Sequence, residues 1–153
     1  MIELQDLEAR LRALKDDAQT RTASGELPAL VAEVVASAHE LTATGQHDAA
    51  IELFQRMLDF CPDDSALRRA SALAHGGKGE RALGLTDQLG VPPSSGGMAL
   101  LEGQFAQAIQ LDPTLPDPHW DLAVIQARFV GDFARAAAHL EDARRLEIGR
   151  AHV

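Results

Sequence analysis

Residues 31–64 read VAEVVASAHELTATGQHDAAIELFQRMLDFCPDD, and this stretch decides the fold. Gly45 is followed by Ala50, Phe54 and Pro62 at five, nine and seventeen residues. A glycine ends one helix because it tolerates the left-handed conformation, and a small residue one turn into the next helix lets the two helices approach. A large apolar residue four positions later lies on the same face, and proline ends the second helix. The stretch therefore predicts a helix–turn–helix unit.

The same offsets recur elsewhere in the chain. Three further glycines start the pattern: Gly131 with Ala136, Leu140 and Ala143; Gly96 with Leu101, Phe105, Ala108 and Pro113; and, more weakly, Gly77 with Ala82, Thr86 and Leu89. Such repetition is typical of arrays in which each unit buries its apolar face against its neighbours. We therefore predict an all-α fold with repeats at about residues 31–64, 65–90, 96–115 and 117–150.

These residues resemble the tetratricopeptide repeat family, whose 34-residue unit combines a Trp–Leu–Gly–Tyr first helix with an Ala–Phe–Pro second helix. The first copy carries Val34, Ala38, Leu41, Gly45, Ala50, Phe54 and Pro62 in the expected slots, and the last carries Trp120, Gly131, Ala136, Leu140 and Ala143. The resemblance covers about residues 28–150. It implies a solenoid of helical hairpins that binds protein partners.

The middle of the array departs from this pattern. The four glycines are spaced 32, 19 and 35 residues apart, so the second interval is short by about one helix. We expect the run Gly76-Gly77-Lys78-Gly79 to be a turn between two helices, and residues 90–97 to break the regular superhelix. The helix Met98–Leu111 then either follows antiparallel or restarts in parallel after the loop crosses back. The break is either a decayed repeat or a hinge.

Residues 1–27 are predicted to form an amphipathic helix and a linker. Leu4, Leu7, Leu11 and Leu14 repeat with 3-4-3 spacing between charged residues, which gives a narrow apolar seam. The helix either caps the first repeat or forms a seam for a homodimer or a docked partner.

The charge of the chain disfavours two classes of partner. With 23 acidic and 14 basic residues the net charge is −9, which argues against nucleic acid and against an anionic membrane surface. The first residues lack the basic and then apolar layout of a signal peptide, and no apolar run approaches a membrane span. We therefore expect a cytoplasmic protein.

No catalytic or metal-binding motif is found in the sequence. Gly76–Gly79 lacks the Ser or Thr that follows the lysine of a phosphate loop, and none of the six histidines pairs with another at the i, i+4 spacing of a helical zinc site. Cys61 is the single cysteine, next to the helix-ending Pro62, where a packed thiol is expected. We expect no enzyme activity, no cofactor and no metal.

The resemblance also implies where a partner would bind, since the first helix of each tetratricopeptide repeat lines a concave groove. Carried onto this chain, the groove positions are Val35, His39, Thr42, Arg68, Ser71, His75, Asp121, Ile125 and Arg128. Val35 and His39 stand where chaperone-tail clamps have lysine and asparagine, and the chain contains no asparagine. A mixed, partly apolar groove favours an extended or helical peptide.

Three functions follow as expectations. The leading one is a protein-interaction module, acting as an adaptor or scaffold. The second is a dedicated client chaperone, similar in size and layout to the translocator chaperones of bacterial type III secretion. The third is a self-assembling structural subunit.

Overall fold

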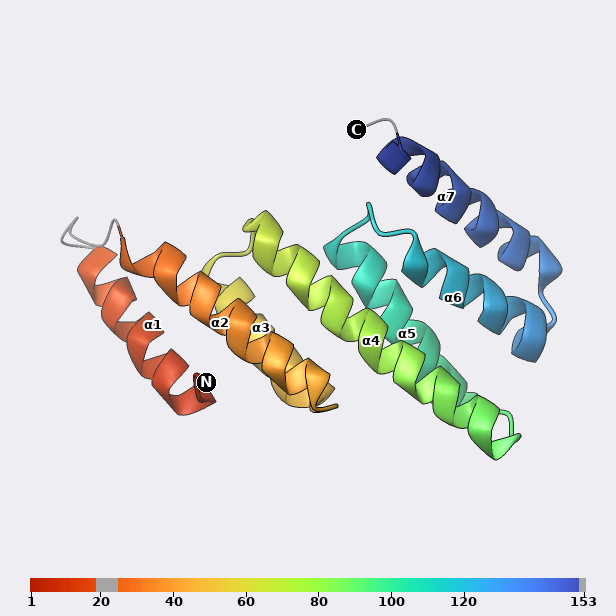
Figure 1. The fold of residues 1–153 in the computed structure, drawn as a ribbon, viewed down its shortest axis with the longest axis horizontal. Coiled ribbons are helices and arrows are strands. Elements are labelled where there is room, and N and C mark those ends of the chain that lie inside the picture. Colours follow the sequence, from red (N-terminus) through yellow and green to blue (C-terminus); the bar gives the residue numbers. More distant parts are fainter. Residues whose placement is uncertain (19–24, 152–153) are drawn as a thin grey trace. The chain divides into compact units, whose positions relative to one another are not determined.

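The computed structural model describes residues 1–18 and 25–151, and every regular element in these ranges is helical (Figure 1). In chain order the elements are α1 (Leu4–Ala18), α2 (Glu26–Ala43), α3 (His47–Phe60), α4 (Ser65–Leu89), α5 (Ser95–Leu111), α6 (Asp117–Ile125), the π-helical turn η1 (Gln126–Val130) and α7 (Phe133–Ala151). The predicted all-α class is confirmed for these ranges. The predicted linker lies outside the described residues over 19–24. None of the described helices has the length and apolar character that crossing a lipid bilayer requires.

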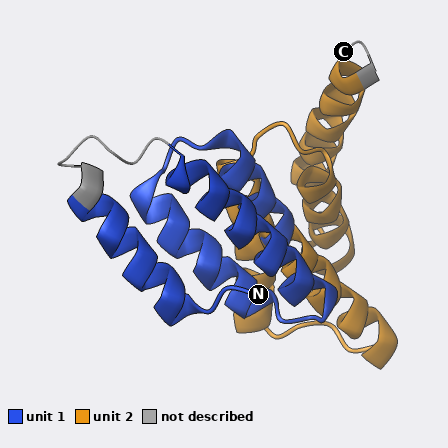
Figure 2. Cartoon of the chain, turned by 60° about the vertical axis from the view of Figure 1, so that its left-hand side comes forward, with its two compact units in different colours: residues 1–74 blue, residues 75–153 orange. Residues whose placement is uncertain are grey.

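The chain divides into two compact units, Met1–Ala74 (unit 1) and His75–Val153 (unit 2), which Figure 2 shows in blue and orange. The boundary falls within α4, so the first turns of this helix belong to unit 1 and the remainder belongs to unit 2. Each unit has its own cluster of buried apolar side chains. The packing is therefore described for each unit by itself.

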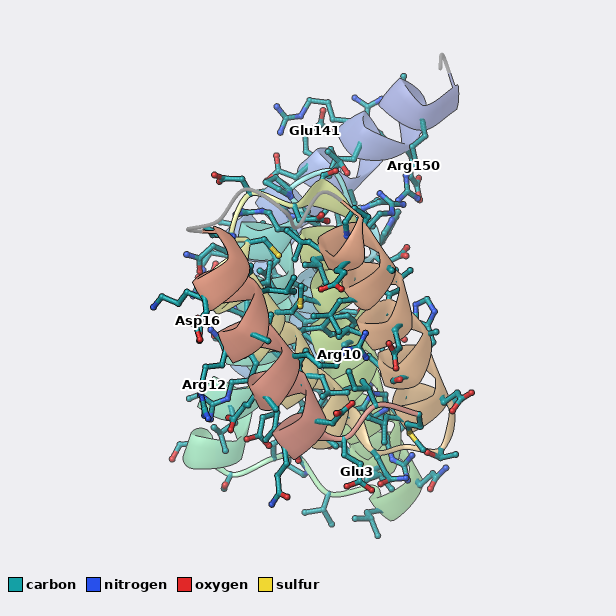
Figure 3. All side chains as sticks on the ribbon, turned by 90° about the vertical axis from the view of Figure 1, so that its left-hand side faces the viewer. Glu3, Arg10, Arg12, Asp16, Glu141 and Arg150 are labelled. Carbon is teal, nitrogen blue, oxygen red and sulfur yellow. The ribbon has the colours of Figure 1, made fainter. Side chains whose placement is uncertain are left out.

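In unit 1, the leucine seam of α1 packs inward. Leu7 and Leu14 are buried in the core of this unit, and Leu4 and Leu11 pack against it. Charged residues of α1 lie outside the seam; in Figure 3, Arg12 and Asp16 point away from α2. Arg10 lies toward α2, where its guanidinium donates to the Glu33 carboxylate at 2.6 Å. The predicted seam is used within its own unit, so a homodimer through these leucines would require α1 to detach.

The hairpin of α2 and α3, together with the first turns of α4, forms the rest of unit 1. α3 packs against both α1 and α2, and Phe54 and Met57 of α3 are fully buried between them. Gly45 has φ +79°, the left-handed conformation that ends α2 two residues before α3 begins. The turn predicted from residues 31–64 is therefore confirmed.

The turn predicted at Gly76–Gly79 is wrong, because α4 continues through this run without interruption. Glycine destabilises a helix but does not forbid it, so three glycines indicate a turn only when no packing favours the helix. Here the packing comes from Phe105: a Cβ atom built on Gly79 would lie 2.6 Å from Cζ of that ring. The glycine lets the Phe105 ring lie directly against the α4 backbone. Residues 65–90 are thus one long helix and not a two-helix repeat.

The partner of this long helix in unit 2 is α5. His75 contacts Gln104, Gly79 contacts Phe105, and Leu83 shares a core cluster with Leu101. Going along α4 from His75 and Gly79 to Leu83, the neighbours in α5 go back from Gln104 and Phe105 to Leu101, so the two helices are antiparallel. The sequence left open whether α5 follows antiparallel or restarts in parallel after a crossing loop, and the structure shows the antiparallel arrangement.

The break predicted at residues 90–97 is shorter than expected. α4 ends at Leu89, Gly90 adopts a left-handed φ of +65°, and α5 already begins at Ser95. Ser94 caps α5, since its hydroxyl accepts from the Gly97 N–H at 3.1 Å. The non-helical segment is therefore only residues 90–94, and Gly96 belongs to a helix.

The remaining elements of unit 2 form a second tight hairpin. α6 packs against α5 and α7, and it runs into η1, whose first residue, Gln126, is fully buried. Gly131 ends this segment with φ +75°, as predicted, and the Asp132 carboxylate then accepts from the Arg135 N–H in the first turn of α7. The Gln126 amide nitrogen donates to Glu102 of α5 at 3.1 Å.

Candidate functional site

Five of the predicted groove residues lie in unit 1. Val35, His39 and Thr42 follow one another at i, i+4 and i+7 on α2, so they share one helix face. His39 is exposed, whereas Val35 is half-buried and packs against the core. On α4, Arg68 is half-buried, but Ser71 is buried and only 3% exposed. Ser71 must therefore be removed from the partner-contacting set, because its hydroxymethyl side chain is small enough to be enclosed in the packing of α4.

The other four predicted groove residues lie in unit 2. Ile125 has no exposed surface and belongs to the core cluster with Leu122 and Phe105, so it is also removed from the set. Arg128 is exposed and forms an ion pair with Asp87 at 2.8 Å. His75 is held by the Gln104 side chain, with 2.9 Å between Nδ1 and Oε1.

Asp121, the fourth of these residues, belongs to a group of carboxylates. Burial, together with the nearby Glu80 and Asp117 carboxylates, raises its pKa to about 6. Glu80 behaves in the same way: its pKa is raised by burial and then by Asp117. Crowded carboxylates of this kind favour a cation as neighbour, because a positive charge lowers their mutual repulsion.

Cys61 has the environment of a structural thiol. Its pKa is raised by burial and then by the Asp64 carboxylate, and its Sγ contacts the Met57 carbonyl oxygen at 3.2 Å. A raised pKa keeps the thiol protonated, whereas a nucleophile requires the thiolate.

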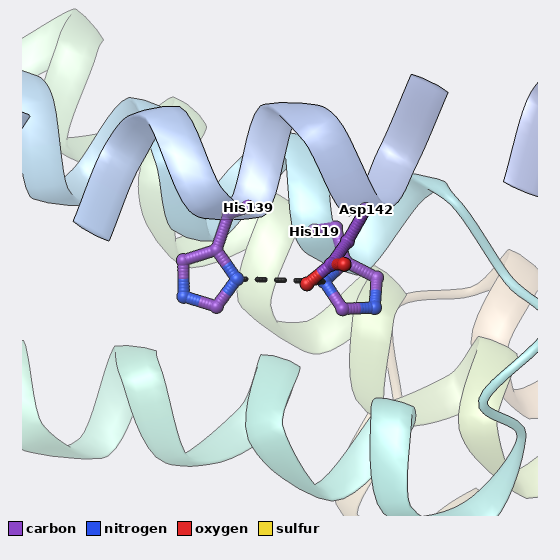
Figure 4. A group of neighbouring side chains, drawn as sticks. All are labelled: His119, His139 and Asp142. Atoms are coloured by element: carbon purple, nitrogen blue, oxygen red, sulfur yellow. Dashed lines mark hydrogen bonds and ion pairs between the residues drawn. The ribbon is translucent and has the colours of Figure 1, made fainter. Parts of the chain in front are cut away.

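A group of titratable side chains that the sequence did not predict lies between α6 and α7 (Figure 4). His119 comes from α6, and His139 and Asp142 come from α7. Their nearest ligand atoms all lie within 4.8 Å of one another. The two Nδ1 atoms face each other at 3.4 Å, and Nδ1 of His119 lies 3.9 Å from Oδ2 of Asp142.

The surroundings of this histidine cluster differ between its two sides. His119 is buried at 9% exposure, and burial lowers the pKa of its imidazole, while Asp142 opposes that shift. On the outer side, the Arg145 guanidinium pairs with Oδ1 of Asp142. Next to His119 in the chain, the Trp120 indole N–H donates to Glu147 of α7 at 3.1 Å. Polar contacts from His119 and Trp120 thus hold α7 against α6 at this cluster.

There is a physical reason why the sequence alone did not predict this cluster. A helical zinc site is indicated by two histidines at i, i+4 on one helix, whereas His139 and Asp142 are a mixed pair at i, i+3. Their third neighbour, His119, stands 20 residues earlier on the other arm of a hairpin. Only the register of α6 against α7 brings the three together, and no local spacing encodes that register.

A second surface feature of unit 2 is the outer face of α7. Phe133, Ala137 and Leu140 recur at i, i+4 and i+7, and all three are exposed, Phe133 by 71%. Ala136 and Ala143, each three residues after Phe133 or Leu140, are buried beside this face, where α7 packs in the hairpin with α6. The apolar surface of α7 therefore extends beyond its contact with α6.

Comparison with known proteins gives no assignment, because no family model and no curated protein sequence matches this chain.

Proposed function

We propose that this chain is a non-catalytic protein-interaction module, an adaptor or scaffold, built from tetratricopeptide-like hairpins. Three antiparallel helix pairs support the proposal: α2 with α3, α4 with α5, and α6 with α7. In such arrays each hairpin stacks on the next into a solenoid, and the family's usual role is to bind protein segments. The single cysteine fits a reducing compartment, so we place the module in the cytoplasm.

The observation that carries the proposal is the exposed apolar face of α7, formed by Phe133, Ala137 and Leu140 (the α7 outer face). Exposed apolar side chains gathered on one face mark interaction sites more often than scattered ones do. The spacing suits an amphipathic helix of a partner, which would lie along α7 as the next helix of the array. A partner helix would bury the Phe133 ring, the largest of these side chains.

The accessible groove residues of each unit remain second candidates: His39, Thr42 and Arg68 in unit 1, and His75, Asp121 and Arg128 in unit 2. The carboxylates around Asp121 would favour a peptide with a basic side chain there. A client chaperone would use the same surfaces for one dedicated client, and a self-assembling subunit would use the α7 outer face for a second copy.

The experiment compares two variants in affinity purification from a lysate of the source organism. Phe133→Ser with Leu140→Ser removes the α7 outer face, while Leu100→Ser removes an equally exposed leucine of α5 as a matched control. We expect one dominant partner to be retained by wild type and by Leu100→Ser, and to be reduced at least tenfold by the double variant. Circular dichroism checks that both variants keep their helicity.

Each other outcome assigns the function differently. Equal retention by the double variant would exclude the α7 outer face, and loss in a His39→Ala, Arg68→Ala, Arg128→Ala variant would then assign binding to the groove. Recovery of the chain alone, with a doubled mass in light scattering that the double variant abolishes, would assign self-assembly.

A further inference from the structure

We infer that His119, His139 and Asp142 bind a divalent transition-metal ion, with zinc as the expected metal. The three side chains come from two packed helices and bring their ligand atoms within 4.8 Å of one another. The site is separate from the α7 outer face, because these residues lie on the side of α7 that faces α6 (Figure 4).

The distance between the two imidazoles fits a shared metal ion. Nitrogen ligands lie about 2.0–2.1 Å from zinc, so two of them at a tetrahedral angle are about 3.3–3.4 Å apart. The observed separation of the His119 and His139 Nδ1 atoms is 3.4 Å. This is long for an N–H···N hydrogen bond, since well-formed ones cluster near 2.9–3.0 Å, about the value for N–H···O bonds. The pair is spaced for an ion between the rings.

The third ligand needs a small movement. Oδ2 of Asp142 lies 3.9 Å from Nδ1 of His119. A tetrahedral zinc ion would bring the oxygen to about 3.3–3.4 Å from each nitrogen. The carboxylate therefore has to approach His119 by about 0.5 Å and, since the ligand atoms all lie within 4.8 Å of one another, His139 by at most about 1.4 Å. Asp142 is a surface side chain with 38% of its area exposed, and a rotation about its side-chain bonds supplies this movement.

The donor set selects the kind of metal. Two imidazoles and one carboxylate suit zinc, copper, nickel and cobalt, whereas magnesium and calcium prefer oxygen ligands alone. Three protein ligands leave one position of a tetrahedral ion for water, on the exposed side near Asp142. Arg145 holds the other oxygen of this carboxylate and so orients the ligand, although its charge opposes that of the metal.

Such an ion would join the two arms of the α6–α7 hairpin. His119 belongs to α6, and both other ligands belong to α7. An ion bound only by the folded hairpin stabilises it by mass action. Its expected effect is therefore structural: it would hold α6 and α7 together.

The test is a zinc titration of the complete chain in competition with a chromophoric chelator. We expect one zinc ion per chain, and at least tenfold weaker binding for each of His119→Gln, His139→Gln and Asp142→Asn, since loss of a direct ligand costs no less than the tenfold typical of residues behind the ligands. His47→Gln removes a histidine of α3, in unit 1, and should leave the zinc affinity unchanged. Unchanged zinc affinity in all three ligand variants would overturn the inference.

A second measurement avoids the effect of substitutions on folding. X-ray absorption of wild-type protein with one equivalent of zinc should show two imidazole ligands and oxygen in the remaining positions. A spectrum without imidazole ligands would contradict the site, and so would a protein that does not bind one zinc ion per chain.

Discussion

Unit 1 and unit 2 differ in how they use their apolar side chains. Among the described residues, the core cluster of unit 1 holds fourteen buried residues and that of unit 2 holds five. The exposed large apolar side chains are distributed in the opposite way: only Met1 and Leu73 lie in unit 1, and nine others lie in unit 2. When a unit buries its apolar side chains within itself, the hydrophobic effect stabilises that unit without a partner. Apolar side chains that are exposed contribute this free energy only when a partner covers them. The comparison is consistent with the proposal that partners bind to unit 2, whereas unit 1 buries most of its apolar side chains in its own core.

The largest expected effect tests the difference between the two cores. Phe54 and Phe105 are both fully buried, one in each unit. Phe54→Ala should cost about 3–5 kcal/mol of unfolding free energy, and Phe105→Ala about 2–3 kcal/mol, because a cavity in a small cluster collapses or hydrates more readily. Hydrogen exchange of the amides in each unit measures the two losses separately. Equal losses would mean that the difference in core size has no energetic consequence.

The next effect tests the close approach that holds α4 against α5 in unit 2. Gly79→Ala should cost about 1–3 kcal/mol, because the new Cβ would lie 2.6 Å from the buried Phe105 ring. Gly84→Ala, on the same helix and with nothing within 4 Å of the new atom, should instead stabilise by about 0.5–1 kcal/mol. Chemical denaturation compares the pair. A stabilising Gly79→Ala would show that the ring moves aside and that unit 2 is packed more loosely than described.

The smallest effect concerns the carboxylates of unit 2. Asp121 has a folded-state pKa of about 6 against an ordinary 3.8, so the folded protein binds more protons than the unfolded one between these values. The stability of unit 2 therefore falls as the pH rises from about 4 to 6, and the full penalty is present above that window. Asp121→Asn should remove this pH dependence and stabilise the protein at pH 7 by about 1 kcal/mol, a reduced figure because the side chain is partly in water.

Denaturation at pH 4 and pH 7 tests this prediction, with Asp87→Asn, outside the carboxylate group, as the control. If Asp121→Asn leaves the pH dependence of stability between pH 4 and 6 unchanged, the assigned pKa is contradicted.

The sequence predicted the parts of the fold that are encoded locally. The leucine spacing from Leu4 to Leu14 located α1, and the offsets from Gly45 and Gly131 located two hairpins with their left-handed turns. It failed at Gly76–Gly79, because glycine is compatible with a turn and with a close helix contact. What decides between them is the Phe105 ring, which lies 26 residues further along the chain than Gly79.

The surface was harder to predict than the helices. The resemblance to the tetratricopeptide repeats placed Ser71 and Ile125 on a binding face, yet both are buried, since the exposed side of a helix depends on its neighbours. The histidine cluster was missed for the same reason, because its ligands meet only through the register of one hairpin.

The Trp120 indole has a spectroscopic consequence. The chain has one tryptophan and no tyrosine, so near-ultraviolet fluorescence excited at the red edge reports on this ring alone. The indole N–H donates a hydrogen bond to Glu147 across the α6–α7 hairpin, and Trp120 directly follows His119 in the chain. Its emission maximum thus follows the opening of that hairpin, and a paramagnetic ion such as Cu²⁺ at the neighbouring histidine would quench it. The molecule therefore carries its own optical probe at the contact between α6 and α7, within unit 2.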